Sequence, residues 1–186
     1  MTSLANYIRT YESALTASFC EQVIERFESD TARQQRNGAT VRSGLAESSW
    51  LEMDLSACQD FNFRNVILSC IRHYKTRYEK DCGIRPPLPE PGQFAPLIVK
   101  RYESGGSDRF QPHFDSIGEV ANRYLVFLWY LNPVESGGET EFIDFGVTSR
   151  PEAGKLLMFP PYWMYRHAGR APTSNTKYIL STYALW

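Results

Sequence analysis

The sequence predicts a mainly β protein with flanking helices, in which N-terminal helices pack on one face of a β-sandwich or double-sheet jelly roll. Three observations predict it. Aromatic residues make up 14% of the 186 residues, and flat rings pack well on pleated sheets. Two stretches in the first half of the chain repeat apolar residues at helical spacing. The second half consists of short apolar or alternating runs separated by turn residues, which is typical of sandwiches and jelly rolls.

Length and composition fit one domain covering residues 1–186. Hydrophobic residues make up 42% of the chain and charged residues 22%, which is ordinary globular composition, and the length is that of one domain. We expect residues 1–95 to form a helical buttress with a connector, and residues 96–186 to form the β-core.

The first predicted helix begins at Ser18, where Ser18 and Glu21 read as a capping box. Apolar residues then recur at helical spacing up to about Glu28. The segment from Asn37 to Glu52 is rich in Gly, Ser and Thr, so it predicts an exposed loop with a short strand near Trp50.

The second predicted helix begins at about Asp60 and carries one apolar stripe as far as Tyr78. Gly83 is expected to end it, because glycine readily adopts the left-handed conformation of a helix C-cap. The proline-rich stretch 86–92 continues neither a helix nor a strand ladder, so it is a connector.

Seven strands are predicted after the connector. They cover Pro96–Tyr102, Phe110–Asp115, Arg123–Leu131, Thr140–Ile143, Lys155–Phe159, Tyr162–Ala168 and Lys177–Leu185.

Charge and hydropathy exclude some classes of partner. Twenty Lys and Arg oppose 21 Asp and Glu, so no basic excess exists for nucleic-acid binding. No apolar run approaches the roughly 20 residues that span a membrane, and the N-terminal residues lack the pattern of a secretion signal. The four cysteines show no metal-type C-x-x-C spacing. Their even number permits disulfides, but the missing export signal favours reduced thiols and a cytoplasmic protein. We expect neither nucleic-acid nor membrane partners.

Three residues form a candidate metal site. His113 and Asp115 are two positions apart on a predicted strand, so their side chains point to one face. His167 follows after enough chain for several strands, so we expect it to return from the opposite sheet as the third ligand. Two imidazoles and one carboxylate on one side of an ion form the facial triad of non-haem Fe(II) oxygenases, which leaves positions open for other ligands.

Four other residues have alternative interpretations. Lys177 begins a strand expected beside the metal strand, where it can pair with a dicarboxylate that also chelates the metal; alternatively, it is a solvated strand-end lysine. Tyr102 and Tyr130 are candidate site residues, and packing in the aromatic core is the alternative for each of them. His73 lies on the second predicted helix and is given no chemistry.

From about Leu97 to Trp186 the sequence resembles the 2-oxoglutarate- and Fe(II)-dependent oxygenases, in the prolyl 4-hydroxylase-like branch. The resemblance rests on an ordered set of motifs: RYESGG at 101–106, HFD at 113–115, Arg123 leading to YLN at 130–132, GGETEF at 137–142, PEAGKLLMF at 151–159, HAG at 167–169 and KY at 177–178. Many members have Trp after the lysine, where this chain has Tyr178.

The resemblance implies the roles of the site residues. It implies that Fe(II) is bound by His113, Asp115 and His167. It implies that Lys177 holds the distal carboxylate of the co-substrate 2-oxoglutarate, with hydroxyl help from Tyr102 and Tyr130. The family fold is a double-stranded β-helix with N-terminal helices on the major sheet, and ascorbate is a reductant compatible with this chemistry.

The implied function is that of a dioxygenase that uses dioxygen to hydroxylate an unactivated C–H bond, with a prolyl residue of a peptide or protein as the leading substrate. Asp115 favours hydroxylation over halogenation, because related halogenases lack this carboxylate. A free amino acid or other small molecule is an alternative substrate. A non-catalytic jelly-roll interaction module is the alternative from a different class.

Three residues are candidate substrate contacts. On the predicted strand 162–168, Trp163 and Tyr165 alternate with His167 onto one side, where they can line the cavity; the alternative places them in the jelly-roll core. Arg109 lies in a candidate lid and can contact substrate, or it is a solvated loop arginine.

Overall fold

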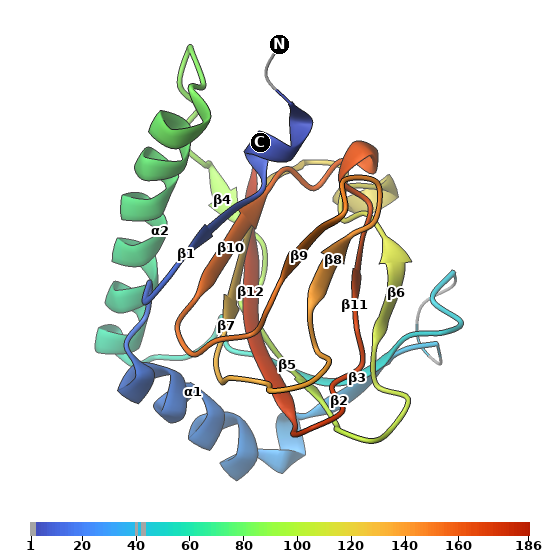
Figure 1. Ribbon diagram of the computed structural model, residues 1–186. Coiled ribbons are helices and arrows are strands. Elements are labelled where there is room, and N and C mark those ends of the chain that lie inside the picture. The colour runs from blue at the N-terminus through green and yellow to red at the C-terminus, as the bar shows by residue number, and fades with distance from the viewer. Residues whose placement is uncertain (1–2, 40, 42–43) are drawn as a thin grey trace.

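The computed structural model describes residues 3–39, 41 and 44–186, which form two antiparallel β-sheets with helices on the outer face of the larger one (Figure 1). The larger sheet has the order β1-β10-β7-β12-β5-β3-β2, with β4 paired to β12. The smaller sheet has the order β6-β11-β8-β9. The predicted mainly β fold with N-terminal helices on the major sheet is confirmed.

The larger sheet comprises β1 (Arg9–Tyr11), β2 (Gln35–Gly38), β3 (Ser49–Asp54), β4 (Gln93–Phe94), β5 (Ile98–Tyr102), β7 (Arg123–Tyr130), β10 (Leu156–Phe159) and β12 (Lys177–Leu185). The smaller sheet comprises β6 (Phe110–His113), β8 (Thr140–Phe142), β9 (Val147–Ser149) and β11 (His167–Gly169). The α-helices are α1 (Ala17–Ser29) and α2 (Phe61–Cys82).

The two α-helices begin and end at residues that satisfy their backbone groups. Asp60 caps α2 by accepting a hydrogen bond from the amide of Phe63 at 3.1 Å, and Gly83 ends it in the left-handed conformation, as predicted. The start predicted for α1 was wrong by two residues. Thr16 is its N-cap, because its extended backbone lets its hydroxyl accept from the amide of Phe19 at 3.2 Å.

Two apolar layers hold the molecule together. The outer layer lies between the helices and the larger sheet, and includes Val23 and Phe27 of α1 together with Trp129 of β7. The inner layer lies between the two sheets, and includes Phe142 and Phe159. Each fully buried large side chain contributes about 1.5–3 kcal/mol, and the inner layer surrounds the space in which the candidate site residues meet.

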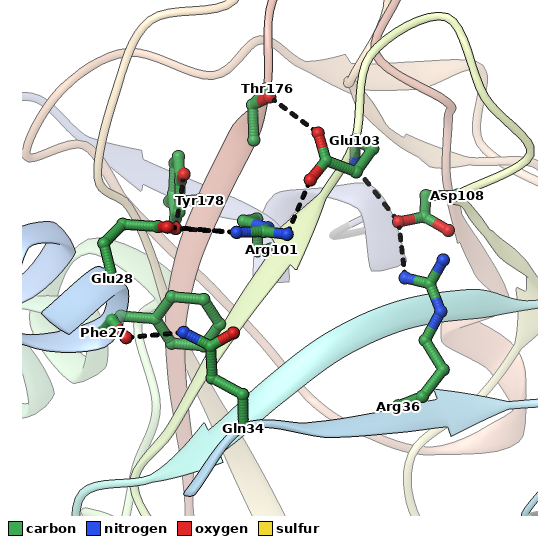
Figure 2. Close-up of polar contacts among 9 residues, drawn as sticks. All are labelled: Phe27, Glu28, Gln34, Arg36, Arg101, Glu103, Asp108, Thr176 and Tyr178. Atoms are coloured by element: carbon green, nitrogen blue, oxygen red, sulfur yellow. Dashed lines mark hydrogen bonds and ion pairs between the residues drawn. The ribbon is translucent and has the colours of Figure 1, made fainter. Parts of the chain in front are cut away.

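Polar contacts tie the end of α1 to strands β5 and β12 (Figure 2). Nη1 of Arg101 lies 3.1 Å from both carboxylate oxygens of Glu28, and the Tyr178 hydroxyl donates to the same carboxylate at 2.8 Å. Nη2 of Arg101 lies 2.7 Å from a carboxylate oxygen of Glu103. These contacts fix the outer faces of the two strands whose inner faces carry pocket residues.

Several predicted boundaries were wrong. The strand expected over 162–168 is confined to β11, since Trp163–Tyr165 forms a 3-10 turn in which the Tyr165 amide donates to the carbonyl of Tyr162 at 2.8 Å. The short strand predicted near Trp50 is confirmed as part of β3. The loop expected from Asn37 to Glu52 begins and ends within the paired strands β2 and β3, and its residues 40, 42 and 43 lie outside the described part of the chain. Residues 1–95 therefore contribute strands as well as helices.

Cys20, Cys58, Cys70 and Cys82 are free thiols. Among the described residues, neither α2 nor any other helix combines the length and the apolar character that a membrane crossing requires.

Candidate metal centre

The candidate metal ligands meet on the smaller sheet. Strands β6 and β11 pair antiparallel, with His113 directly opposite His167, so the two imidazole centroids lie 4.3 Å apart. Asp115 follows β6 rather than lying within it, and its amide donates to the carbonyl of Pro161 at 3.0 Å. One potential ligand atom from each of the three side chains lies within 4.8 Å of the other two.

Each imidazole is oriented by a backbone carbonyl two residues earlier in the chain. Nδ1 of His113 lies 2.8 Å from the carbonyl oxygen of Gln111, and Nδ1 of His167 lies 3.0 Å from that of Tyr165. Because a carbonyl only accepts, each Nδ1 carries the proton and each Nε2 keeps its lone pair. Both Nε2 atoms lie 3.5 Å from the Asp115 carboxylate, so the free lone pairs converge.

Burial and neighbouring charges set the ionisation of this cluster. Burial, together with the adjacent His113, lowers the pKa of His167 to about 4. Burial alone would raise the pKa of Asp115, but His167 and His113 bring it below its ordinary value. The Tyr183 hydroxyl also donates to Asp115 at 3.1 Å. A neutral imidazole and a carboxylate anion are the forms that bind metals.

Lys177 faces the cluster from the larger sheet. It is 2% exposed, and Nζ lies 5.2 Å from the ring centroid of Tyr102 and 5.6 Å from that of Tyr130. Within the part of the chain that the structure describes, this ammonium makes no hydrogen bond or ion pair. Burial lowers its pKa to about 7, although the charge of Glu139 opposes this. A buried cation of this kind can form a binding site for an anion.

The two predicted co-substrate tyrosines differ in position. Tyr102 pairs with Lys177 across β5 and β12 and lines the pocket. The Tyr130 hydroxyl instead donates to Oγ1 of Thr140 at 2.7 Å and lies 3.3 Å from the Ser149 carbonyl. Thr140 lines the pocket, so Tyr130 reaches it through Thr140. Burial raises the pKa of both tyrosines, that of Tyr130 to about 12, so both hydroxyls are protonated at neutral pH.

The candidate substrate residues lie elsewhere. Arg109 is exposed, and its Nη2 lies 2.8 Å from the carboxylate of Glu47. Trp163 is 70% exposed. Tyr165 is 2% exposed and donates to the carbonyl of Leu4 at 3.2 Å, so it belongs to the inner apolar layer. The structure does not bring these three side chains together with the metal cluster.

The structure also shows pocket residues that the sequence analysis missed. The polar side chains lining the pocket are Lys100, Tyr102, His113, Asp115, Thr140, His167, Lys177, Ser181 and Tyr183. Of these, Lys100, Thr140, Ser181 and Tyr183 were not predicted. Strand parity was the available signal for three of them, since Lys100 lies two positions before Tyr102, and Ser181 and Tyr183 lie four and six positions after Lys177. The cavity volume is only about 30 Å³, room for about two waters, so a larger ligand enters only as wall side chains shift.

Comparisons with known proteins give the relatives of this chain. Residues 97–185 match the model of the 2OG-Fe(II) oxygenase superfamily. Two curated relatives are a probable prolyl 4-hydroxylase 11 of Arabidopsis thaliana, 38% identical over 42% of this chain, and the prolyl 4-hydroxylase subunit alpha-2 of Gallus gallus, 29% identical over 69% of it. The chain spans 29% and 22% of the lengths of these two proteins.

The fold is that of a solved prolyl hydroxylase. The viral collagen prolyl hydroxylase of Paramecium Bursaria Chlorella virus-1, in its 2OG complex, matches with a TM-score of 0.71 and 18% identity over 95% of this chain and 94% of that one. The predicted double-stranded β-helix is thereby confirmed. Over its β-core the chain is similar to the 2OG-Fe(II) oxygenase superfamily, and both curated relatives carry the name prolyl 4-hydroxylase.

Proposed function

We propose that this protein is a 2-oxoglutarate- and Fe(II)-dependent dioxygenase that hydroxylates an unactivated C–H bond, with a prolyl residue of a peptide or protein as the leading substrate. One observation carries the proposal. The imidazoles of His113 and His167 and the carboxylate of Asp115 converge on one wall of a pocket. The Lys177 ammonium, which has no hydrogen-bond partner among the described residues, lies on the facing wall.

The donor set fits the metal that the family implies. His113, Asp115 and His167 would hold Fe(II) through two Nε2 atoms and one carboxylate oxygen, all on one side of the ion. The carbonyls of Gln111 and Tyr165 fix the tautomers, so these nitrogens need not reorient when the ion arrives. When bound, iron and 2-oxoglutarate supply the oxidising chemistry: one atom of dioxygen enters the substrate and the other enters succinate, with loss of CO₂.

The facing wall fits a dicarboxylate co-substrate. Lys177 would form a charge-assisted pair with the carboxylate farthest from the metal, and the Tyr102 hydroxyl would donate to it. Tyr130 holds the Thr140 hydroxyl, so we assign Tyr130 a positioning role through Thr140. The apolar residues around these groups keep bulk water out, which strengthens each polar contact.

The substrate and the location are supported more indirectly. The named prolyl 4-hydroxylases among the relatives support a prolyl substrate. Arg109 and Trp163 are exposed, where a large substrate would meet them outside the pocket. A cytoplasmic location stays a prediction, and the four free thiols fit a reducing compartment.

The test is anaerobic addition of Fe(II) and 2-oxoglutarate. The wild-type protein should give a weak visible charge-transfer band, and Asp115→Ala should lose it. His73→Gln is the matched control, because His73 is an exposed histidine of α2 away from the pocket. Aerobic succinate release should then rise with members of a panel of prolyl peptides and free amino acids. A wild-type protein that gives neither band nor succinate would reject the proposal in favour of a binding module.

A further inference from the structure

Lys100 places a second cation in the candidate active site. It lies on β5 two residues before Tyr102, so both side chains point to the inner face of the larger sheet. It is directly opposite Ile179 of β12 on one side and Glu52 of β3 on the other. It lines the same pocket as the candidate metal ligands.

Aromatic rings hold the Lys100 ammonium on the metal side of the pocket. Nζ lies 5.2 Å from the ring centroid of Trp50 and 5.4 Å from that of Phe110, distances at which a cation is attracted to a ring face. The Phe110 ring is stacked on the His113 imidazole, with centroids 3.5 Å apart and planes at 9°. One aromatic ring therefore lies next to both Lys100 and a candidate metal ligand.

Glu52 is the anion that lies next to Lys100 in the strand register. Glu52, opposite Lys100, accepts hydrogen bonds from Nδ2 of Asn37 at 2.5 Å and from Nε1 of Trp50 at 2.6 Å. A lysine ammonium has three donors, so it can bind a further acceptor from the pocket in addition to neighbours within the chain. Burial is the main cause of the lowered pKa of Lys177, and the charge of Lys100 lowers it further, so the two cations act within one poorly solvated space.

The proposed reaction leaves this second cation without a role. Lys177 and the metal account for the two ends of 2-oxoglutarate, and Asp115 offsets part of the charge of the metal. An additional cation within the pocket therefore suits an additional anion close to the carbon that reacts. An acidic side chain on a neighbouring residue of a long peptide would lie outside this narrow pocket, whereas a carboxylate on the reacting residue itself would lie inside it.

We propose that Lys100 is a specificity-determining residue that selects substrates with a free carboxylate on the residue that is hydroxylated, either a free amino or imino acid or the C-terminal residue of a peptide. This inference rests on the proposed function and narrows its substrate class. The carboxylate would accept from the Lys100 ammonium while the reacting carbon faces the metal ligands.

The experiment compares acids with their amides. Succinate release is measured with N-acetyl-L-proline against N-acetyl-L-prolinamide, with glycyl-L-proline against its amide, with free L-proline, and with equivalent acid–amide pairs of other amino acids. The wild-type protein should use at least one acid about tenfold or more better than its amide. Lys100→Met and Lys100→Gln should bring this ratio close to one, and Lys100→Arg should retain it. Since each ratio compares two probes on one variant, partial unfolding does not affect it.

Each outcome decides the inference. Equal use of acids and amides by the wild-type protein, or stimulation by no acid, would overturn it. An acid preference that survives in both Lys100→Met and Lys100→Gln would also overturn it. Poor binding of 2-oxoglutarate by these variants would overturn it as well, because Lys100 would then bind the co-substrate. Absence of the Fe(II)–2-oxoglutarate band in the wild-type protein would instead reject the proposed function. Stimulation by free proline but not by glycyl-proline identifies a free acid as the source of the carboxylate, and the reverse identifies a peptide C-terminus.

Discussion

The Lys177 ammonium lies among aromatic rings with almost no exposure to water, and this burial brings its pKa to about 7. The charged groups that act on it are Glu139, which favours its charge, and Lys100, which opposes it. Tyr102 and Tyr130 stay protonated, because burial raises the pKa of both. The charge of Lys177 in the ligand-free protein therefore changes with pH across the neutral range.

We predict that affinity for 2-oxoglutarate falls as pH rises above about 7. The dianion binds the protonated lysine, so deprotonation of the free protein weakens binding by up to about tenfold per pH unit, until the pKa of the bound lysine is reached. The visible band, titrated between pH 6.5 and 9 at saturating Fe(II), measures it. Lys177→Arg is the control, because arginine stays charged. An equally steep fall in that variant would show that another group is responsible.

We predict that Tyr130 and Thr140 act as one unit on the co-substrate. Removal of the Tyr130 hydroxyl in Tyr130→Phe frees the Thr140 hydroxyl to rotate, so affinity for 2-oxoglutarate should fall by about fivefold, which is the value of one neutral hydrogen bond. Thr140→Val should lose a similar amount, and the double variant should lose little more than either single variant. Titration of the visible band gives all four affinities. Additive losses would indicate that Tyr130 acts independently of Thr140.

The helices and strands that could be predicted are those with strong local signals. Asp60 and Gly83 bound α2 because a side-chain acceptor and a left-handed glycine satisfy its end groups. The long strands β7 and β12 are apolar over many residues. Strands β1, β4 and β9 have two or three residues each, too few to show a period. The sequence of the turn at Trp163–Tyr165 also fits a strand, because alternating aromatic residues occur in both turns and strands.

At the level of elements, we predict that the contact between Glu28 and Arg101 stabilises the packing of α1 on the larger sheet (Figure 2). In a double-mutant cycle with Glu28→Gln and Arg101→Met, urea unfolding should give a coupling energy of about 1 kcal/mol. The side chain of Arg101 is 23% exposed and that of Glu28 is 40% exposed, so solvent screening keeps the coupling energy low.

The matched control for this cycle is the pair Arg166 and Asp144, whose side chains are 48% and 47% exposed. It should give less than half of that coupling, because both partners are well solvated. Equal coupling energies for the two pairs would contradict a special role for the contact between α1 and β5.

On the scale of the whole molecule, the site exists because two sheets face each other. His113 and His167 come from the smaller sheet and Asp115 from the segment that follows β6, whereas Tyr102 and Lys177 come from the larger sheet. Sequence spacing indicated that His113 and Asp115 share a side, because parity is a local property. The expectation that His167 returns from the opposite sheet was wrong, since β11 pairs with β6 in the same sheet. Sequence spacing did not indicate that His113 lies directly opposite His167, because the register of β6 on β11 is set by the packing of both sheets.

The same architecture predicts a conflict between stability and function at Lys177. A lysine whose folded-state pKa is about 7 binds fewer protons than the unfolded chain between pH 7 and its ordinary value of 10.5. Its cost to folding is thus complete below about pH 7 and disappears as pH rises toward 10.5.

We predict that Lys177→Met makes the metal-free protein more stable at pH 7, by roughly 1–3 kcal/mol, while it removes 2-oxoglutarate binding. Urea unfolding at pH 7 and pH 10 measures the difference between the two proteins, which should shrink at pH 10 because the wild-type lysine is then mostly neutral. A variant that is less stable than the wild-type protein at pH 7 would mean that packing around the lysine stem outweighs the cost of burying its charge.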